Sequence, residues 1–109
     1  MRYNPLASAP TDLIHIHYEI AEDAWISIFS SDRLLIGSDG SCDLRPAGRR
    51  IGRLHAEIYP EGDCWWVRDL GSAGGTYLDD ECIDVAPLSG PATLQLGGDG
   101  PTIRLALAR

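Results

Sequence analysis

The most regular alternation in the sequence is LIHIHYEI, at residues 13–20. Polar residues alternate there with apolar or aromatic ones, and this two-residue period is typical of a half-buried β-strand. Glu and Asp at residues 22–23 fit a turn, and AWISIF at residues 24–29 has the composition of another strand. The first part of the chain is therefore predicted to contain two consecutive strands.

Short segments with strand composition continue toward the C-terminus, separated by turns rich in Gly, Pro, Asp and Ser. They cover residues 33–37, 42–44, 56–59, 64–70, 76–78, 81–83, 92–96 and 102–107. Residues 60–63 are expected to form a hairpin turn, with Gly62 available for a positive φ. No long window carries the apolar stripe of an amphipathic helix. The pattern predicts an all-β sandwich or barrel whose function lies in its loops.

Length and charge restrict the class of protein. The chain has 109 residues, 44% of them hydrophobic, which fits one globular domain. Residues 1–11 are expected to form a flexible arm, and residues 12–109 the domain. The formal net charge of -7 argues against a general nucleic-acid binder, because phosphate contacts need concentrated positive charge. No apolar run is long enough for direct membrane insertion.

The cysteines are Cys42, Cys64 and Cys82, an odd number, and residues 1–10 lack the apolar stretch of a signal peptide. Together these features predict reduced thiols and a cytoplasmic location. No pair has the spacing of a zinc knuckle or a redox motif, so buried apolar roles are favoured. A catalytic thiol beside His55 is the less favoured alternative, because no third residue in the sequence orients such a pair.

Three segments together resemble the forkhead-associated (FHA) domain family. LIGSDGSCDL at residues 35–44 is similar to the family's Ile-Gly-Arg strand end and its small loop ending in Cys-Asp-Ile. IGRLHAEI at residues 51–58 resembles Val-Ser-Arg-x-His-Ala-x-Ile. DLGSAGGTYL at residues 69–78 resembles Asp-Leu-x-Ser-x-Asn-Gly-Thr-x-Val/Leu. In this order and spacing the motifs are specific, and the resemblance covers about residues 13–107.

The resemblance implies an eleven-stranded β-sandwich of two mainly antiparallel sheets with functional loops at one end. It also implies recognition of a phosphothreonine peptide by those loops. Several acceptor oxygens and about two negative charges make a phosphate a good match for Arg, hydroxyl and backbone N–H donors.

The chain departs from the family pattern at the contact positions. The family arginine after Gly37 is replaced by Ser38, the phosphate-binding serine by Gly52, and the asparagine that binds the peptide main chain by Gly74. Ordinary phosphothreonine recognition is therefore expected to be weakened or lost.

The positions that match the family are mainly structural. The resemblance implies that Gly37 allows a tight strand exit and that His55 braces the binding loops from inside. It implies that Gly75 sets the last loop. The scaffold residues thus match the family, while the contact residues do not.

All nine basic residues are Arg, and four of them lie within residues 45–53. These four are Arg45, Arg49, Arg50 and Arg53. In one interpretation they form an anion site that replaces the missing donors. In the other they belong to a solvated loop and pair with Asp39, Asp43 or Glu57.

Other candidate residues have a structural explanation that is favoured over a functional one. His15 and His17 are two residues apart and lack a visible third metal ligand, so an exposed strand face is the favoured interpretation. Trp65 and Trp66 must point to opposite faces of their strand, so one is expected in the core and the other partly exposed. The glycines at residues 71–75 lack the strand–loop–helix context of a nucleotide site.

The sequence is therefore interpreted as a non-catalytic FHA-type interaction module that binds an acidic or threonine-phosphorylated segment of another protein. The partner surface is expected at the loop end, at Ser38, Arg45, Arg49, Arg50, Gly52, Arg53, Ser72 and Gly74. No catalytic residue, cofactor or metal is expected. The alternative is a structural subunit of a multiprotein assembly, for example a bacterial secretion assembly, that uses sheet faces or edges.

Overall fold

The structure, a computed structural model, describes residues 13–108. The expected flexible arm at residues 1–11 and both ends of the expected domain, 12 and 109, lie outside the described residues. The described part contains ten β-strands and no helix. They are β1 (Leu13–Ala21), β2 (Ala24–Ser30), β3 (Leu34–Ile36), β4 (Ala56–Glu61), β5 (Cys64–Asp69), β6 (Thr76–Leu78), β7 (Glu81–Ile83), β8 (Val85–Leu88), β9 (Ala92–Leu96) and β10 (Thr102–Ala108).

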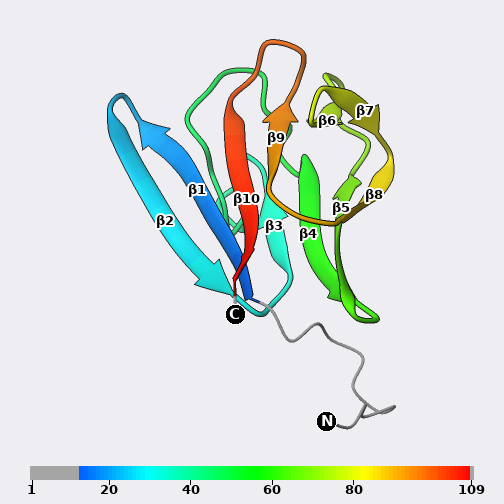
Figure 1. The fold of residues 1–109 in the computed structure, drawn as a ribbon. Helices are drawn as coiled ribbons and strands as arrows, with labels where there is room; N and C mark the ends of the chain where they lie inside the picture. The colour runs from blue at the N-terminus through cyan, green and yellow to red at the C-terminus, as the bar shows by residue number, and fades with distance from the viewer. Residues whose placement is uncertain (1–12, 109) are drawn as a thin grey trace, which may run out of the picture.

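The strands form two sheets whose ladders are all antiparallel (Figure 1). The larger sheet has six strands in the order β2-β1-β10-β9-β6-β7, and the smaller has four in the order β3-β4-β5-β8. Buried side chains of both sheets join one hydrophobic core. The predicted all-β sandwich of two mainly antiparallel sheets is thereby confirmed.

The number of strands differs from the expectation. Ten strands lie in the described residues, not eleven, and residues 42–44 form only a single parallel bridge, between Leu44 and Ile36. Conversely, β8 was not predicted, because Pro87 lies within it. β8 is an edge strand that pairs only with β5, and an edge tolerates proline because one of its sides makes no ladder bonds.

The turn between β4 and β5 is shorter than the predicted span of residues 60–63. Pro60 and Glu61 still belong to β4, and the chain reverses at Gly62 and Asp63. Gly62 has a φ of 67°, the positive value expected at this turn. A second tight turn, at Asp79 and Asp80, has φ values of 47° and 71° and joins β6 to β7.

The two-residue alternation places the core. In β1, Ile14 and Ile16 are fully buried between the sheets, whereas His15 and His17 point to the outer face and are half-buried. In β5, Trp65 is buried in the core and Trp66 is half-exposed, as the alternation predicted.

Three loops meet at one end of the sandwich, the upper end in Figure 1. They follow β3 (residues 37–55), β5 (residues 70–75) and β9 (residues 97–101). Gly97 donates its N–H to the carbonyl oxygen of Gly75 at 2.9 Å, and Leu70 donates to that of His55 at 2.9 Å. The segments that carry the three sequence motifs are therefore held together at this end with the loop at residues 97–101.

No helix in residues 13–108 has the length and apolar character needed to cross a membrane.

Candidate functional site

His55 connects the loops at this end from within. Its side chain is fully buried, its Nδ1 accepts the N–H of Gly52 at 3.0 Å, and its Nε2 lies 2.9 Å from the carbonyl oxygen of Gly75. Nδ1 is thus an acceptor, so the geometry requires a neutral ring with its proton on Nε2, donated to Gly75. The ring joins the loop after β3 to the loop after β5, which is the geometry that a bracing role requires.

Gly37 allows two parts of the long loop to approach each other closely. A Cβ atom at this position would lie 2.1 Å from the carbonyl oxygen of Arg53, so any side chain would force the backbone apart. Beyond it, Ser38 donates its N–H to the carbonyl oxygen of Gly52 at 3.0 Å, and Asp39 donates to that of Arg53 at 3.1 Å. Positions 38 and 52 are consequently neighbours.

Arg53 is held by Asp39. Its Nη2 lies 3.1 Å from Asp39 Oδ1, while Asp39 Oδ2 accepts both the hydroxyl and the N–H of Ser41. The hydroxyl and N–H of Ser41, followed by Arg53, lower the pKa of Asp39 from 3.8 to about 2. These three residues line a shallow hollow with Leu54. Arg53 remains exposed, but its charge is already balanced by a carboxylate.

Asp69 organises the loop after β5. Its carboxylate accepts the hydroxyls of Ser72 and Thr76 and the N–H groups of Gly71 and Ser72. Burial raises the pKa of Asp69, and these hydrogen bonds, led by the Ser72 and Thr76 hydroxyls, outweigh it, so the pKa is lowered. The Ser72 hydroxyl donates its hydrogen bond to Asp69 and accepts one from the N–H of Gly75. To donate to a bound phosphate, Ser72 would have to break the bond to Asp69.

A side chain is disfavoured at Gly75 and at Gly74 for different physical reasons. Gly75 has a φ of 85°, a left-handed conformation that a side chain disfavours. Gly74 is exposed, and a Cβ there would lie 3.3 Å from the Cα of Gly97. The loop after β9 therefore packs against the backbone at the position where the family pattern has asparagine.

Arg49 and Arg50 line a groove between these loops. The groove has a volume of about 610 Å³ and is also lined by Gly74, by residues 96–101 and by two acids, Glu19 and Asp99. Within residues 13–108, neither arginine takes part in an ion pair. Arg50 has a φ of 62°, which is costly for a residue with a long side chain. The groove thus holds two guanidinium groups that make no ion pair within the described residues, and two carboxylates also line it.

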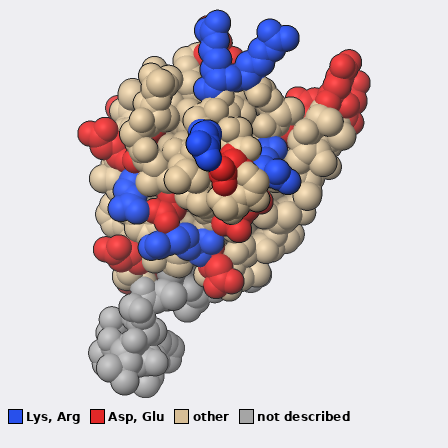
Figure 2. All heavy atoms as spheres, turned by 180° about the vertical axis from the view of Figure 1, so that it is seen from behind, with Lys and Arg blue, Asp and Glu red and all other residues tan. Residues whose placement is uncertain are grey.

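The four arginines do not form one cluster. Arg49 and Arg50 lie together at the groove, Arg53 lies at the Asp39 hollow, and Arg45 is exposed and lines neither. The interpretation as a solvated, paired loop applies to Arg53. Of the other two proposed partners, Glu57 pairs with Arg33 and Arg68 instead, and Asp43 accepts the backbone N–H of Leu35. Figure 2 shows blue and red side chains interspersed over one face of the molecule, with no single large basic patch.

The alternative sites gain no support from the geometry. Cys42 is buried and donates to the carbonyl oxygen of Arg53, and burial raises the pKa of its thiol, which disfavours the reactive thiolate. His15 and His17 stack on Phe29 and Trp25, with ring centroids 4.4 Å and 5.0 Å apart. Among the described residues, no group of three or more potential metal ligands comes together.

The organising role of two carboxylates was not predicted: Asp39 was expected only as one ion-pair partner of the arginines, and Asp69 only as part of a family motif. Both accept hydrogen bonds from the backbone two residues ahead, at Ser41 and Gly71. An Asp followed two or three residues later by Gly or Ser is the usual signal of such a side-chain turn. The signal is present in the sequence at both places and could have identified them.

A family model described as FHA domain matches residues 34–97. A 56-residue stretch is 34% identical to the probable E3 ubiquitin-protein ligase dma1 of Schizosaccharomyces pombe, covering 45% of this chain and 21% of that protein. A 43-residue stretch is 42% identical to the FHA domain-containing protein FhaB of Mycolicibacterium smegmatis, covering 37% of this chain and 28% of that protein. The matches span less than a third of the length of these curated relatives.

Solved structures share the fold. FHA-1 of Mycobacterium tuberculosis Rv1747 has a TM-score of 0.75 at 22% identity, covering 94% of this chain and all of that one. The FhaA FHA domain, solved in complex with the intracellular domain of Rv3910, has a TM-score of 0.71 at 18% identity, covering 84% and 98%. Mycobacterium tuberculosis EmbR, solved with a low affinity phosphopeptide, has a TM-score of 0.66 at 18% identity, covering 88% and 24%.

The family match runs from β3 into the loop after β9 and includes His55, Asp69 and Gly75, the residues that hold the loops together. Because it covers more than half of a chain that also has the fold of solved FHA domains, this chain belongs to the FHA domain family.

Proposed function

We propose that this FHA domain is a non-catalytic module that binds an acidic or threonine-phosphorylated segment of another protein through its loop end. The observation that carries the proposal is the groove at Arg49 and Arg50. Two guanidinium groups without a carboxylate partner are available there to an incoming anion, and Arg is well suited to carboxylate and phosphate oxygens.

The same proposal includes weakened phosphothreonine recognition. Ser38, Gly52 and Gly74 lack the guanidinium, hydroxyl and amide that the family pattern has at these positions. The backbone N–H of Gly52 is occupied by His55, and Arg53, whose side chain stays exposed, already makes an ion pair with Asp39. Within residues 13–108, Arg49 and Arg50 are the arginines that line the groove at the loop end and make no ion pair.

Similar proteins support a protein or phosphopeptide partner. The FhaA domain is in complex with an intracellular protein domain, and EmbR is in complex with a phosphopeptide. A cytoplasmic location is proposed on the free thiols of Cys42, Cys64 and Cys82.

A titration with three versions of one degenerate peptide library tests the proposal. The versions carry phosphothreonine, threonine or glutamate at the fixed position, and affinity is measured by fluorescence anisotropy at several salt concentrations. We expect the phosphorylated and acidic versions to bind more tightly than the threonine version, and the preference to weaken with salt. Equal binding of all three versions would contradict an anion site.

Two variants with opposite expected effects on affinity test whether the groove is the binding site. Replacing both Arg49 and Arg50 with Ala should weaken binding of the anionic peptides and flatten its salt dependence. Asp99→Asn removes a negative charge from the groove rim and should strengthen it. Arg45→Ala is the matched control, because Arg45 lies on the same loop but outside the groove. If Arg45→Ala has the same effect as the double variant, the groove is not the site.

A further inference from the structure

The outer edge of β2 is open. β2 ends the six-stranded sheet, and no strand of residues 13–108 pairs with its free side. It has seven residues, AWISIFS, with no charged residue, proline or glycine. Trp25 and Phe29 are 52% and 59% exposed, and Ile26 is 36% exposed on the opposite face. A long, uncharged, apolar edge is a template for pairing with another strand.

The other three sheet edges are protected. β7 has only three residues and begins with Glu81, and β8 contains Pro87. β3 also has three residues, and Asp43 and Leu44 cover its edge by donating their N–H groups to the carbonyl oxygen of Leu35. Short strands, charges, proline and covering segments are the usual means of blocking edge pairing. Within residues 13–108, β2 has none of them.

The sequence of β2 is complementary to itself. If two copies of β2 lie antiparallel with Ser27 opposite Ser27, Trp25 lies opposite Phe29 and Ile26 opposite Ile28. Residues opposite each other in an antiparallel pair point to the same face, so aromatic residues meet on one face and isoleucines on the other. A shift by two residues places both aromatic residues opposite serine or a residue outside the strand. Only the register centred on Ser27 pairs all seven residues.

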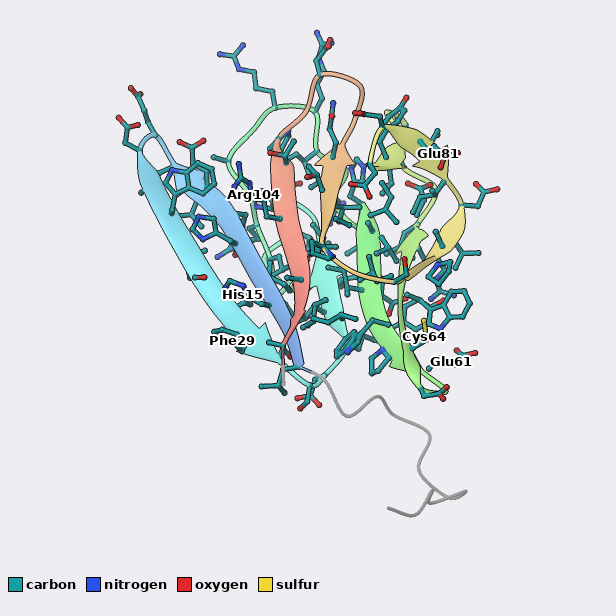
Figure 3. All side chains as sticks on the ribbon, viewed as in Figure 1. His15, Phe29, Glu61, Cys64, Glu81 and Arg104 are labelled. Carbon is teal, nitrogen blue, oxygen red and sulfur yellow. The ribbon has the colours of Figure 1, made fainter. Side chains whose placement is uncertain are left out.

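Side chains of β1 support the aromatic face of β2. Phe29 stacks on His15 and Trp25 on His17, so both exposed rings are supported from β1. The hydroxyl of Ser27 lies 2.6 Å from His15 Nε2 on the same face. Figure 3 shows His15 and Phe29 on adjacent strands at this side of the sheet. Rings that are already fixed lose less conformational entropy when a partner covers them.

We propose that the chain forms a two-fold symmetric dimer through β2, with the axis at Ser27 and one continuous sheet across both copies. The four aromatic rings of the two strands would form a row along the outer face. Because the paired strands are antiparallel, the two loop ends would point in opposite directions. The proposal does not depend on what the loop end binds.

Sedimentation equilibrium of the full chain tests the proposal. We expect the mass to rise with concentration from 11.8 kDa toward twice that value. Ser27→Lys places two lysine side chains directly opposite each other at the axis, with their Cβ atoms roughly 4.5–5.5 Å apart, and this like-charge pair should weaken association at least tenfold. Ser27→Ala removes the same hydroxyl without adding charge and should still dimerise. Thr93→Lys adds the same charge elsewhere on this face, on β9, and should also dimerise.

Cross-linking tests the register without a disruptive substitution. In a background with Cys64 and Cys82 replaced by serine, Ser27→Cys should form an intermolecular disulfide, because opposed antiparallel residues lie within disulfide range. Thr93→Cys, an exposed control on the same sheet face, should not.

Three results would overturn the proposal. The first is a wild-type chain that stays monomeric to millimolar concentration, which would leave the edge for a strand of another protein. The second is a Ser27→Lys variant that dimerises as the wild type does. The third is a Ser27→Cys variant that cross-links no faster than Thr93→Cys.

Discussion

Restoring the three missing contact residues should create tight phosphothreonine binding. The triple variant Ser38→Arg, Gly52→Ser and Gly74→Asn supplies one charged donor, one hydroxyl and one amide at the loop end. We expect it to bind a phosphothreonine peptide more than tenfold more tightly than the wild type.

The positions of the three residues indicate how much each substitution should contribute to the affinity for a phosphothreonine peptide. Positions 38 and 52 are joined by a hydrogen bond of 3.0 Å, so a new guanidinium and a new hydroxyl there can converge on one phosphate. A Cβ at Gly52 would lie 3.4 Å from His55 Nδ1, a contact that a small side chain tolerates. Charge-assisted hydrogen bonds contribute about 1.5–3 kcal/mol each, and ~1.4 kcal/mol is a factor of ten. The pair of changes alone is sufficient for the predicted gain.

The asparagine should contribute least. A Cβ at Gly74 would lie 3.3 Å from the Cα of Gly97, so the loop after β9 must shift to accept it. The double variant Ser38→Arg, Gly52→Ser is therefore expected to have most of the affinity of the triple variant. It should also keep the thermal midpoint closer to that of the wild type.

Isothermal titration calorimetry with the phosphorylated peptide library and its unphosphorylated twin measures the gain. Ser31→Arg is the control, because Ser31 is an exposed serine in the turn between β2 and β3, at the opposite end of the sandwich (Figure 1). It adds the same charge and should not change binding. If the wild-type chain already binds the phosphopeptide as tightly as the triple variant, the interpretation of a degenerate site is wrong.

Three further predictions concern the loop scaffold. His55→Ala leaves the Gly52 N–H without its partner and removes one of the two hydrogen bonds to the Gly75 carbonyl oxygen, which still accepts the N–H of Gly97. It should reduce the free energy of unfolding by about 1–3 kcal/mol in denaturant titrations, and an unchanged midpoint would exclude bracing. Asparagine adopts a φ of 62° more readily than arginine, so Arg50→Asn should raise the free energy of unfolding by up to about 1 kcal/mol. The same variant should lower the affinity for anions, and a drop in stability would show that the conformation of Arg50 is not strained. The lowered pKa of Asp69 means that its stabilisation is complete above its unfolded value, about 4, and is lost as pH falls through the folded value. Asp69→Asn should therefore flatten the acid side of the melting profile, and an unaltered slope would contradict this assignment.

The strand pattern was largely predictable from the sequence because alternation reports directly on burial. The Ile14 and Ile16 positions of β1 and the Trp65–Trp66 pair of β5 follow that rule. The positive φ of Gly62 was predictable for a different reason, because a tight hairpin turn favours glycine. β8 escaped detection because a proline usually ends a strand, and only the tertiary position at an edge makes Pro87 acceptable.

The site was less predictable, because proximity in sequence is a poor guide to proximity in a loop. Arg50 and Arg53 are three residues apart, yet the chain turns between them through a left-handed residue and they line different hollows. Asp39 pairs with Arg53 from fourteen positions away. The sequence offered Asp39 as one of three acidic partners, because no local pattern distinguishes among them. Which donors and acceptors meet at the loop end therefore depends on the fold and not on their spacing in the sequence.

The contact between Gly74 and Gly97 also has an evolutionary consequence. A Cβ at position 74 would lie 3.3 Å from the Cα of Gly97, so a larger residue at 74 requires the loop at residues 97–101 to shift by a few tenths of an ångström. Within the family, the residue at this position should therefore covary with the length or conformation of the loop that joins the last two strands.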